Sequence, residues 1–470
     1  MNGSKLLRVL GALVVLVLLG IGGFIAYAWE REIPAAEPPA VSSIDPELVQ
    51  RGATLAAVGN CNVCHTKEGG EVFAGGLALP TPFGTIYSTN ITPDPETGIG
   101  RWSEEAFQRS MRSGVDREGR HLYPAFPFDH FTKVTDEDNR ALYAYLMTRK
   151  PVKAEAQAND LPFPLNIRLA VAGWKLLFFR EGVYQPDTAQ SDEWNRGHYL
   201  ADGLGHCGAC HTPRNSLGAE KKDQLFAGGE AEGWTAYALN QNSPAPLPWD
   251  VDALTHYLAN GWEEHHGVAR GPMAPVTANM MSVPESDARA IATYVTSVMG
   301  EPTPERQARA DKVRDQATRH PPGIQVQAAG GQTVPVAATS QDRGALIYAA
   351  ACSSCHDAGR PVPYGGLPLA LSTATYGPTP LNPINVILYG LPAPEGERGP
   401  IMPGFAGVLD DAQTADLLAY IRATFSDKPA WDDVQDLVRQ VRSGKEHTDL
   451  QSLSSGGSAP ANPTRRETSW

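Results

Sequence analysis

One pattern occurs three times in the 470-residue chain: Cys61-Asn-Val-Cys64-His65, Cys207-Gly-Ala-Cys210-His211 and Cys352-Ser-Ser-Cys355-His356. These motifs use all six cysteines of the chain. Paired cysteines could also form disulfides or bind zinc, but neither explains a histidine directly after every second cysteine. The pattern is typical of covalent haem attachment, in which the two thiols bond the haem vinyl groups and the histidine ligates the iron. The sequence therefore predicts three covalent c-type haems.

The motifs mark an internal repeat, since their first cysteines lie 146 and then 145 residues apart. A short helical pattern with an Arg-Gly pair precedes each motif: Arg51-Gly52, Arg196-Gly197 and Arg343-Gly344. A second amphipathic helical pattern closes each repeat and contains a tyrosine: Tyr145, Tyr294 and Tyr420. We expect the two helices of each repeat to cross, with the glycine allowing close approach at the tyrosine. Helix starts are predicted at Asp45-Pro46, Ser191-Asp192 and Ser340 before the motifs, and at Ser282/Glu285 and Asp410/Gln413 for the closing helices.

The predicted fold is mainly α, with three tandem class I cytochrome c domains after an N-terminal transmembrane helix. The expected segments are an anchor or signal at 1–40, domains at 45–150, 191–300 and 340–430, linkers at 151–190 and 301–339, and a tail at 431–470. Within the first linker, 161–179 is too apolar to be free, so we expect it to pack on a domain or contact a partner. The tail from Ser443 is rich in Ser, Gly and Pro, which is typical of disorder.

The N-terminus predicts delivery to a membrane. Lys5 and Arg8 precede a 21-residue uncharged run, Val9 to Trp29, which as a helix of about 32 Å would cross the bilayer core. Positive charge before the run keeps that side in the cytoplasm and places the rest in the periplasm. Ala26-Tyr27-Ala28 also fits a signal-peptidase site, so a cleaved signal is the alternative to a retained anchor in the bacterial inner membrane.

A haem that only transfers electrons needs a second axial ligand, which in cytochromes c is usually methionine. Met273 lies 21 residues before Tyr294 and Met402 lies 18 before Tyr420, both in proline-containing loops. We predict Met273 and Met402 as the second ligands of the second and third haems. The alternatives to Met273 are Met280 and Met281.

The first repeat departs from this pattern. Its equivalent position is Phe126, which cannot bind iron, and the nearest ligating side chain is His130. We therefore predict His65 and His130 as the ligands of the first haem, which would lower its reduction potential below that of the other two. The alternatives are a surface His130 with five-coordinate iron, or another side chain, with His121 and Met111 further away.

The net charge and the motifs of the chain argue against several classes of function. The net charge of −13 argues against nucleic acid, because a phosphate-binding face needs clustered Lys and Arg. No paired catalytic carboxylates, nucleophile–base set or phosphate loop stands out. The leading hypothesis is an electron-transfer subunit. The alternatives are a peroxidase-like haem enzyme with an open iron in the first domain, and a cytochrome module of a terminal oxidase.

Four further phrases carry a family resemblance: Tyr87-Ser-Thr-Asn-Ile-Thr-Pro-Asp-Pro-Glu-Thr-Gly-Ile-Gly-Arg-Trp102, Leu122-Tyr-Pro-Ala, Trp234-Thr-Ala-Tyr-Ala-Leu-Asn240 and Gly271-Pro-Met-Ala. With the haem motifs, the chain from about 45 to 440 resembles the tri-haem cytochrome c subunit of bacterial membrane-bound dehydrogenases acting on alcohols, gluconate or sugar alcohols. The resemblance implies a periplasmic membrane-bound subunit that takes electrons from a catalytic subunit and delivers them to ubiquinone.

The chain differs from the alcohol and gluconate members at Phe126, where they tend to carry methionine. Phe126 with His130, and the ending Pro429-Ala-Trp431, look more like relatives paired with molybdenum hydroxylases that act on nicotinate, isoquinoline or aldehydes. The implied partner is thus a molybdenum hydroxylase or a flavin dehydrogenase. The implied acceptor is ubiquinone or a terminal oxidase.

Overall fold

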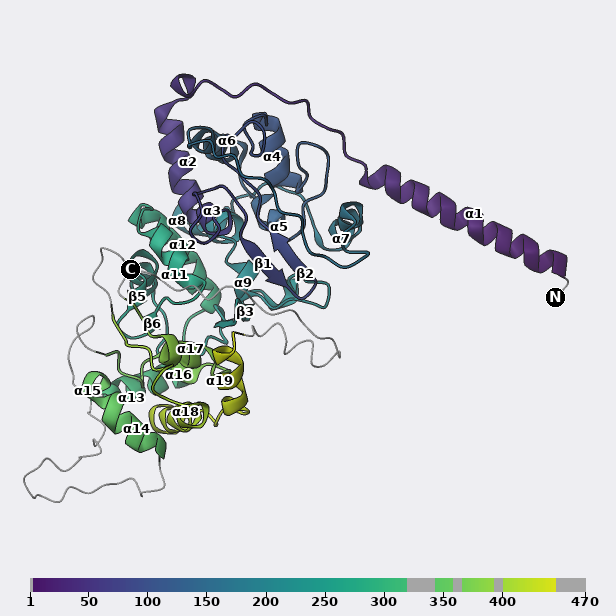
Figure 1. Ribbon diagram of the computed structural model, residues 1–470. Coiled ribbons are helices and arrows are strands. Elements are labelled where there is room, and N and C mark those ends of the chain that lie inside the picture. Colours follow the sequence, from purple (N-terminus) through teal and green to yellow (C-terminus); the bar gives the residue numbers. More distant parts are fainter. Residues whose placement is uncertain (1–2, 319–342, 358–365, 393–399, 445–470) are drawn as a thin grey trace, which may run out of the picture. The chain divides into compact units, whose positions relative to one another are not determined.

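The computed structural model describes residues 3–318, 343–357, 366–392 and 400–444. The chain folds into two compact units, Met1–Gln185 and Pro186–Trp470 (Figure 1). Within the described residues the fold is mainly helical, as predicted, and its strands form only short two-stranded antiparallel hairpins. Much of the expected second linker (319–339) and of the tail (445–470) lies outside the described residues.

The first unit begins with one long helix and continues with shorter ones around a single hairpin. Its elements are α1 (Gly3–Ala28), α2 (Pro46–Val58), α3 (Cys61–Cys64), β1 (Ala78–Thr81), β2 (Gly84–Tyr87), α4 (Glu104–Ser113), α5 (Phe128–Phe131), α6 (Asp136–Met147) and α7 (Val171–Phe178).

The second unit contains the second and third haem motifs. Its elements are α8 (Asp192–Tyr199), α9 (Gly208–His211), β3 (Gly229–Ala231), β4 (Trp234–Ala236), α10 (Val251–Asn260), β5 (Trp262–Glu263), β6 (Gly267–Val268), α11 (Met273–Met280), α12 (Glu285–Met299), α13 (Pro304–Thr318), α14 (Arg343–Ala351), α15 (Ser353–His356), α16 (Thr373–Tyr376), α17 (Leu381–Tyr389), α18 (Asp411–Phe425) and α19 (Val434–Arg442).

The helix before each haem motif packs on the closing helix of the same repeat: α2 on α6, α8 on α12 and α14 on α18. The predicted close approach is confirmed. A Cβ on Gly52 would lie 2.0 Å from the Ala141 carbonyl oxygen and 2.7 Å from the Tyr145 Cβ. The distances for Gly197 are 1.8 Å to the Ala290 oxygen and 3.0 Å to the Tyr294 Cβ, and Gly344 repeats the arrangement. At each crossing only glycine fits, because backbone meets backbone.

The arginine before each of these glycines ties the same two helices together. Each guanidinium pairs with an aspartate on the closing helix: Arg51 with Asp138, Arg196 with Asp287, and Arg343 with Asp416. In the second repeat the pair is bidentate, with N–O distances of 2.8 and 2.9 Å. This fork geometry adds orientation as well as attraction. The Arg-Gly pairs therefore serve packing, with one residue permitting the crossing and the other holding it.

Ser340 lies outside the described residues, and most of the other predicted helix starts agree with the structure. Asp45 caps α2 with Pro46 at the first helical position, and Ser191 caps α8. Asp410 and Gln413 form a complete capping box. The Ser282/Glu285 prediction is wrong, since α12 follows Pro284 without a side-chain cap and the Ser282 hydroxyl donates to Asn279 instead.

Two segments expected as linker or tail contain packed helices. In 301–339, α13 buries Ala310 and Val313 against Leu247 and Leu371. In 431–470, α19 packs on α18 and buries Val438 completely in the core of the third repeat. Both helices were missed because their short apolar stripes lie in strongly polar sequence. The expected packing of 161–179 is confirmed, since Val171 and Ala172 are buried.

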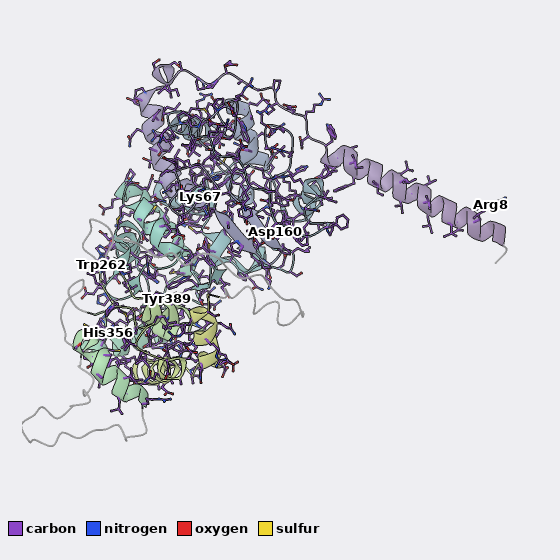
Figure 2. The ribbon with its side chains drawn as sticks, viewed as in Figure 1. Arg8, Lys67, Asp160, Trp262, His356 and Tyr389 are labelled. Carbon is purple, nitrogen blue, oxygen red and sulfur yellow. The ribbon has the colours of Figure 1, made fainter. Side chains whose placement is uncertain are left out.

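Helix α1 runs out from the first unit, with Arg8 near its far end (Figures 1 and 2). Within it, Leu7–Ala28 is long and apolar enough to cross a membrane, although a signal sequence has the same features. Its apolar side chains, such as Leu16 and Leu19, are exposed. The last residue of α1, Ala28, is 1% exposed.

Candidate haem sites

Each haem motif is folded into a single helical turn. The backbone N–H of His65, His211 or His356 donates to the carbonyl of the first cysteine of its motif, at 3.0 Å in all three. Residues three apart on a helix lie on one face, so the turn directs both thiols to the same side. None of the six cysteines is in a disulfide. This arrangement suits two bonds to neighbouring positions on one ring.

Each motif histidine is fixed by a backbone carbonyl. The Nδ1 of His65 donates to Thr89 O at 2.6 Å, that of His211 to Tyr237 O at 2.6 Å, and that of His356 to Leu367 O at 2.8 Å. Because a carbonyl oxygen only accepts, Nδ1 carries the proton and Nε2 keeps its lone pair. Burial lowers the pKa of all three imidazoles and so favours the neutral form. A neutral imidazole with a fixed tautomer is what an iron ligand requires.

The accepting carbonyls come from loops that sequence reasoning did not connect to the histidines. In the first two repeats they follow a hairpin: Thr89 comes two residues after β2, and Tyr237 directly after β4. Both lie inside phrases that carry the family resemblance, 87–102 and 234–240. In the third repeat Leu367 follows Gly366, where a Cβ would lie 2.9 Å from the His356 Nδ1. The acceptor follows its histidine by 24 residues in the first repeat, 26 in the second and 11 in the third, so spacing alone could not have identified it.

A cavity of about 410 Å³ within the second unit joins the second and third sites. Its lining includes Cys207, Cys210, His211, Cys352, Cys355 and His356. Most of the remaining wall is apolar or aromatic, including Trp249, Leu254, Ile387 and Leu417. Figure 2 labels His356, which lies at the end of α15. A flat, mostly apolar porphyrin needs an enclosure of this kind, with thiols at its edge and an imidazole facing inward. The residues present fit haem.

Both predicted methionine ligands border this cavity. Met273 begins α11, and the preceding Gly271 is covered by the indole of Trp234, 2.5 Å from where a Cβ would be. Met402 is held by paired backbone hydrogen bonds with Leu391, at 2.8 and 2.9 Å. The alternatives Met280 and Met281 are not among the residues that line the cavity. The ligand role of Met273 and Met402 stays a prediction.

In the first repeat, Phe126 packs against Phe131, with ring centres 5.1 Å apart. His130 lies on α5 and is 3% exposed, so it is not a surface histidine. His121 has both ring nitrogens engaged, with Nδ1 accepting from Lys175 at 3.0 Å and Nε2 donating to Ala28 O at 2.9 Å. These bonds leave His121 no lone pair for iron. His130 therefore remains the predicted second ligand.

The first cysteine of each motif is partly or fully buried, whereas Cys64 and Cys355 are exposed. Burial raises the pKa of Cys61 and Cys207 to about 12 and that of Cys352 to about 11. Such thiols are poor thiolates at neutral pH, whereas a redox-active CxxC pair lowers the pKa of its exposed cysteine. The surroundings of the first cysteines therefore do not favour the reactive thiolate that a thiol–disulfide oxidoreductase needs at that position.

The helical fold, the CxxCH motifs and the anchored histidines define a c-type cytochrome that holds haem covalently. The cytochrome c family matches residues 49–150 and 341–425, which include the first and third motifs. The fructose dehydrogenase cytochrome subunit of Gluconobacter japonicus is 36% identical over 435 residues, covering 90% of this chain and 88% of that protein. The gluconate 2-dehydrogenase cytochrome c subunit of Pantoea cypripedii is 36% identical over 402 residues, covering 80% and 86%.

The chain belongs to the family of cytochrome c subunits of dehydrogenases, which transfer electrons within an oxidoreductase complex. A subunit of the nicotinate dehydrogenase of Pseudomonas putida is 47% identical over 421 residues, covering 89% of this chain. The chain spans only 34% of the length of that relative. The identity and coverage of the fructose and gluconate dehydrogenase subunits confirm the predicted family.

Proposed function

We propose that the chain is an electron-transfer subunit that carries three covalent haems, one in each of three tandem cytochrome c domains. It passes electrons from a periplasmic dehydrogenase subunit to ubiquinone or a terminal oxidase. The observation that carries this proposal is the threefold recurrence of one arrangement: a turn with two cysteines and a histidine whose Nδ1 is tied to a backbone carbonyl.

Bound haem supplies one-electron chemistry, since its iron alternates between the ferrous and ferric states. The residues of the chain hold the ring and set its surroundings. The cysteines of the three motifs would bond it, and His65, His211 and His356 would each present Nε2. The carbonyl acceptors at Nδ1 raise the basicity of these imidazoles and fix their orientation. Met273, Met402 and His130 would occupy the opposite side.

The shared cavity of the second unit supports transfer between the second and third sites. The motif residues of both repeats line the same cavity. The second repeat is also joined to the third by direct bonds. Asn382 accepts from the Thr235 N–H at 2.8 Å and donates to the Thr235 carbonyl at 2.9 Å. These bonds hold the second and third repeats in contact beside the shared cavity.

We further infer that α1 is retained as an anchor and that the rest of the chain lies on the periplasmic side of the inner membrane. Signal peptidase would cut after Ala28 at the small-x-small site. Ala28 is 1% exposed, and its carbonyl accepts from His121, itself 5% exposed. Cleavage would break a buried contact of the first unit. That contact supports retention.

The partner is a catalytic dehydrogenase subunit, either a molybdenum hydroxylase or a flavin dehydrogenase. The similarity to the nicotinate dehydrogenase relative favours the first kind, and the similarity to fructose dehydrogenase and gluconate 2-dehydrogenase subunits favours the second. We favour a molybdenum hydroxylase, because Phe126 together with His130 resembles the relatives that pair with such enzymes.

The first test counts haems on the full-length chain, made in a host that attaches haem and purified in mild detergent. Pyridine haemochrome absorbance with intact mass should give three haems per chain and a chain that keeps residues 1–28. Two haems or fewer would overturn the proposal.

Carbon monoxide binding and peroxide turnover distinguish the proposed electron-transfer subunit from a peroxidase-like haem enzyme. We expect both to be weak, and strong turnover would favour a peroxidase-like haem enzyme. Co-purification in gentle detergent then identifies the dehydrogenase partner.

A further inference from the structure

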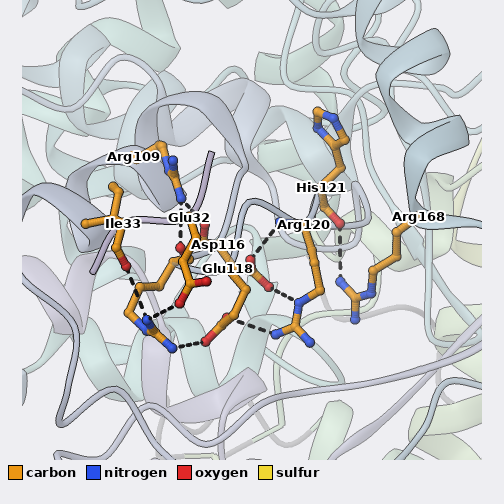
Figure 3. Close-up of polar contacts among 9 residues, drawn as sticks. Glu32, Ile33, Arg109, Asp116, Glu118, Arg120, His121 and Arg168 are labelled. Carbon is orange, nitrogen blue, oxygen red and sulfur yellow. Dashed lines mark hydrogen bonds and ion pairs between the residues drawn. The ribbon is translucent and has the colours of Figure 1, made fainter. Parts of the chain in front are cut away.

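The last residue of α1 and the segment after it are locked to the first unit. His121 Nε2 donates to Ala28 O at 2.9 Å, and the Ile33 N–H donates to Arg117 O at 2.9 Å. Arg109 donates to Arg31 O at 2.6 Å. Arg117 pairs with Glu32 at 3.0 Å (Figure 3). Bonds spread over several consecutive residues allow no free hinge here. If α1 is retained in the membrane, as proposed above, the face of the unit beside the end of α1 lies at the membrane surface.

The segment 161–179 occupies that face. Helix α7 lies beside the last turns of α1, with a Cβ on Gly173 falling 3.7 Å from the Phe24 ring. Lys175 of α7 donates to Ser113 O at 2.6 Å, to Gly114 O at 2.8 Å and to His121 Nδ1 at 3.0 Å. His121 in turn holds Ala28. The chain of bonds from α7 through His121 to α1 fixes the two helices relative to each other.

The outward side of this segment is apolar. The exposed fractions are 80% for Phe163, 56% for Leu176, 63% for Leu177, 41% for Leu165 and 44% for Ile167. The one cation of α7, Lys175, points inward and is 7% exposed. A helix in water shows the opposite arrangement, with its charges outside. An apolar patch of this kind marks a contact with lipid or protein.

Two features identify lipid as the occupant. The patch lies beside α1, and exposed Tyr27 of α1 and Trp29 directly after it sit where aromatic residues meet the bilayer interface. Arginines also flank α7 at both ends: Arg168 donates to His121 O, and exposed Arg180 donates to Phe179 O at 2.7 Å. Cations at the rim of an apolar patch suit phospholipid headgroups.

We propose that segment 161–179 is a second membrane contact, lying in the boundary between headgroups and acyl chains beside α1. Phe163, Leu176 and Leu177 enter the lipid, and the inward Lys175 ties the helix to the cytochrome fold. This inference rests on the proposed retention of α1 in the membrane. As a consequence, two membrane contacts restrain the first unit, so the first haem site keeps a fixed height and tilt above the bilayer. With α1 as its one contact, the unit could reorient.

The test uses the full-length haem-loaded chain, without partner subunits, in nanodiscs of phosphatidylcholine and phosphatidylglycerol doped with a photoreactive phosphatidylcholine. After illumination, peptides carrying lipid are identified by mass spectrometry. We expect adducts on α1 and on 161–179. The double variant L176N/L177N should lower adducts on 161–179 at least roughly fivefold, without lowering those on α1. V72N is the matched control, because Val72 lies in the same unit and is 57% exposed.

Adducts confined to α1 would overturn the proposal. So would equal labelling of 161–179 in the wild type and the double variant. Both leucines are exposed, so folding should persist, and an unchanged haem spectrum checks it. If the intact mass lacked α1 while 161–179 still took up lipid, the anchor would fail and the contact would stand. If lipid missed 161–179 but a purified dehydrogenase subunit covered it, the patch would be a protein interface and the proposal would fall.

Discussion

The glycine at the crossing of α8 and α12 gives a sharp prediction for the substitution Gly197→Ala. A Cβ there would lie 1.8 Å from the Ala290 oxygen and 2.5 Å from its carbon. Since carbon and oxygen in contact stay about 3.3 Å apart, the two helices would have to separate by about 1.5 Å. That shift would strain the Arg196–Asp287 pair and the stacking of His198 on Tyr294, whose ring centres lie 4.5 Å apart.

The expected loss of stability follows from two opposing effects. Overpacking a tight contact costs about 3 kcal/mol when the neighbour is backbone that cannot rotate away. Alanine returns about 1 kcal/mol through its better helix propensity. The net loss of about 2 kcal/mol corresponds to a melting temperature lower by roughly 4–8 °C. Far-UV circular dichroism of the haem-loaded protein in detergent measures this shift.

A matched control is Gly407→Ala, because Gly407 is exposed in the same unit and a Cβ there meets nothing within 4 Å. The control should melt within about 1 °C of the wild type. The reasoning is refuted if Gly197→Ala melts together with Gly407→Ala at full haem loading. Gly52→Ala and Gly344→Ala should behave like Gly197→Ala, because the crossings repeat.

Further predictions concern ligands and the attachment of α1. His130→Ala should turn the first haem high-spin, because the variant loses the predicted second ligand of the iron. The optical spectrum shows this change. Met402→His should lower the reduction potential of one haem by on the order of 100 mV in a redox titration, since imidazole is a stronger donor than thioether. Lys175→Met should cost about 1–3 kcal/mol in thermal unfolding, because buried carbonyls and a ring nitrogen lose their donor. Acidification should loosen the end of α1, as burial lowers the pKa of His121 and so favours its neutral form. That stabilising contribution is complete above the ordinary pKa of histidine and is lost as the pH falls through the folded value, which amide exchange at residues 28–33 measures.

Each of these predictions has a contradicting result. An unchanged optical spectrum rejects His130 as a ligand, and an unchanged potential rejects Met402. A Lys175→Met variant as stable as the wild type would show that its partners are satisfied elsewhere. If the amides of residues 28–33 were equally protected from exchange at about pH 7.5 and about pH 5.5, after correction for intrinsic exchange, the protonation of His121 would have no effect on the attachment of α1.

The sequence predicted features whose physical cause is local or repeated. The CxxCH motifs, the glycine crossings and the Asp410 capping box each depend on residue types at short, fixed spacing. The carbonyl partners of His65, His211 and His356 were not predicted, because a backbone acceptor leaves no mark in residue identity. The Arg196–Asp287 pair was missed for a related reason: 91 residues separate its members, and only the fold brings them together. His121 illustrates the same limit, since its partners Lys175 and Ala28 come from distant segments.

The two sides of each haem site differ in how they can change. The acceptor that orients His65, His211 or His356 is main chain, so no single amino-acid replacement can delete it; only a reshaped loop can. The opposite side is predicted to depend on one side chain, methionine in two repeats and histidine in the first. Mutation can therefore alter the electron affinity of one centre at a time while the attachment stays constant. A gene built by repeating one unit would acquire three unequal centres in this way.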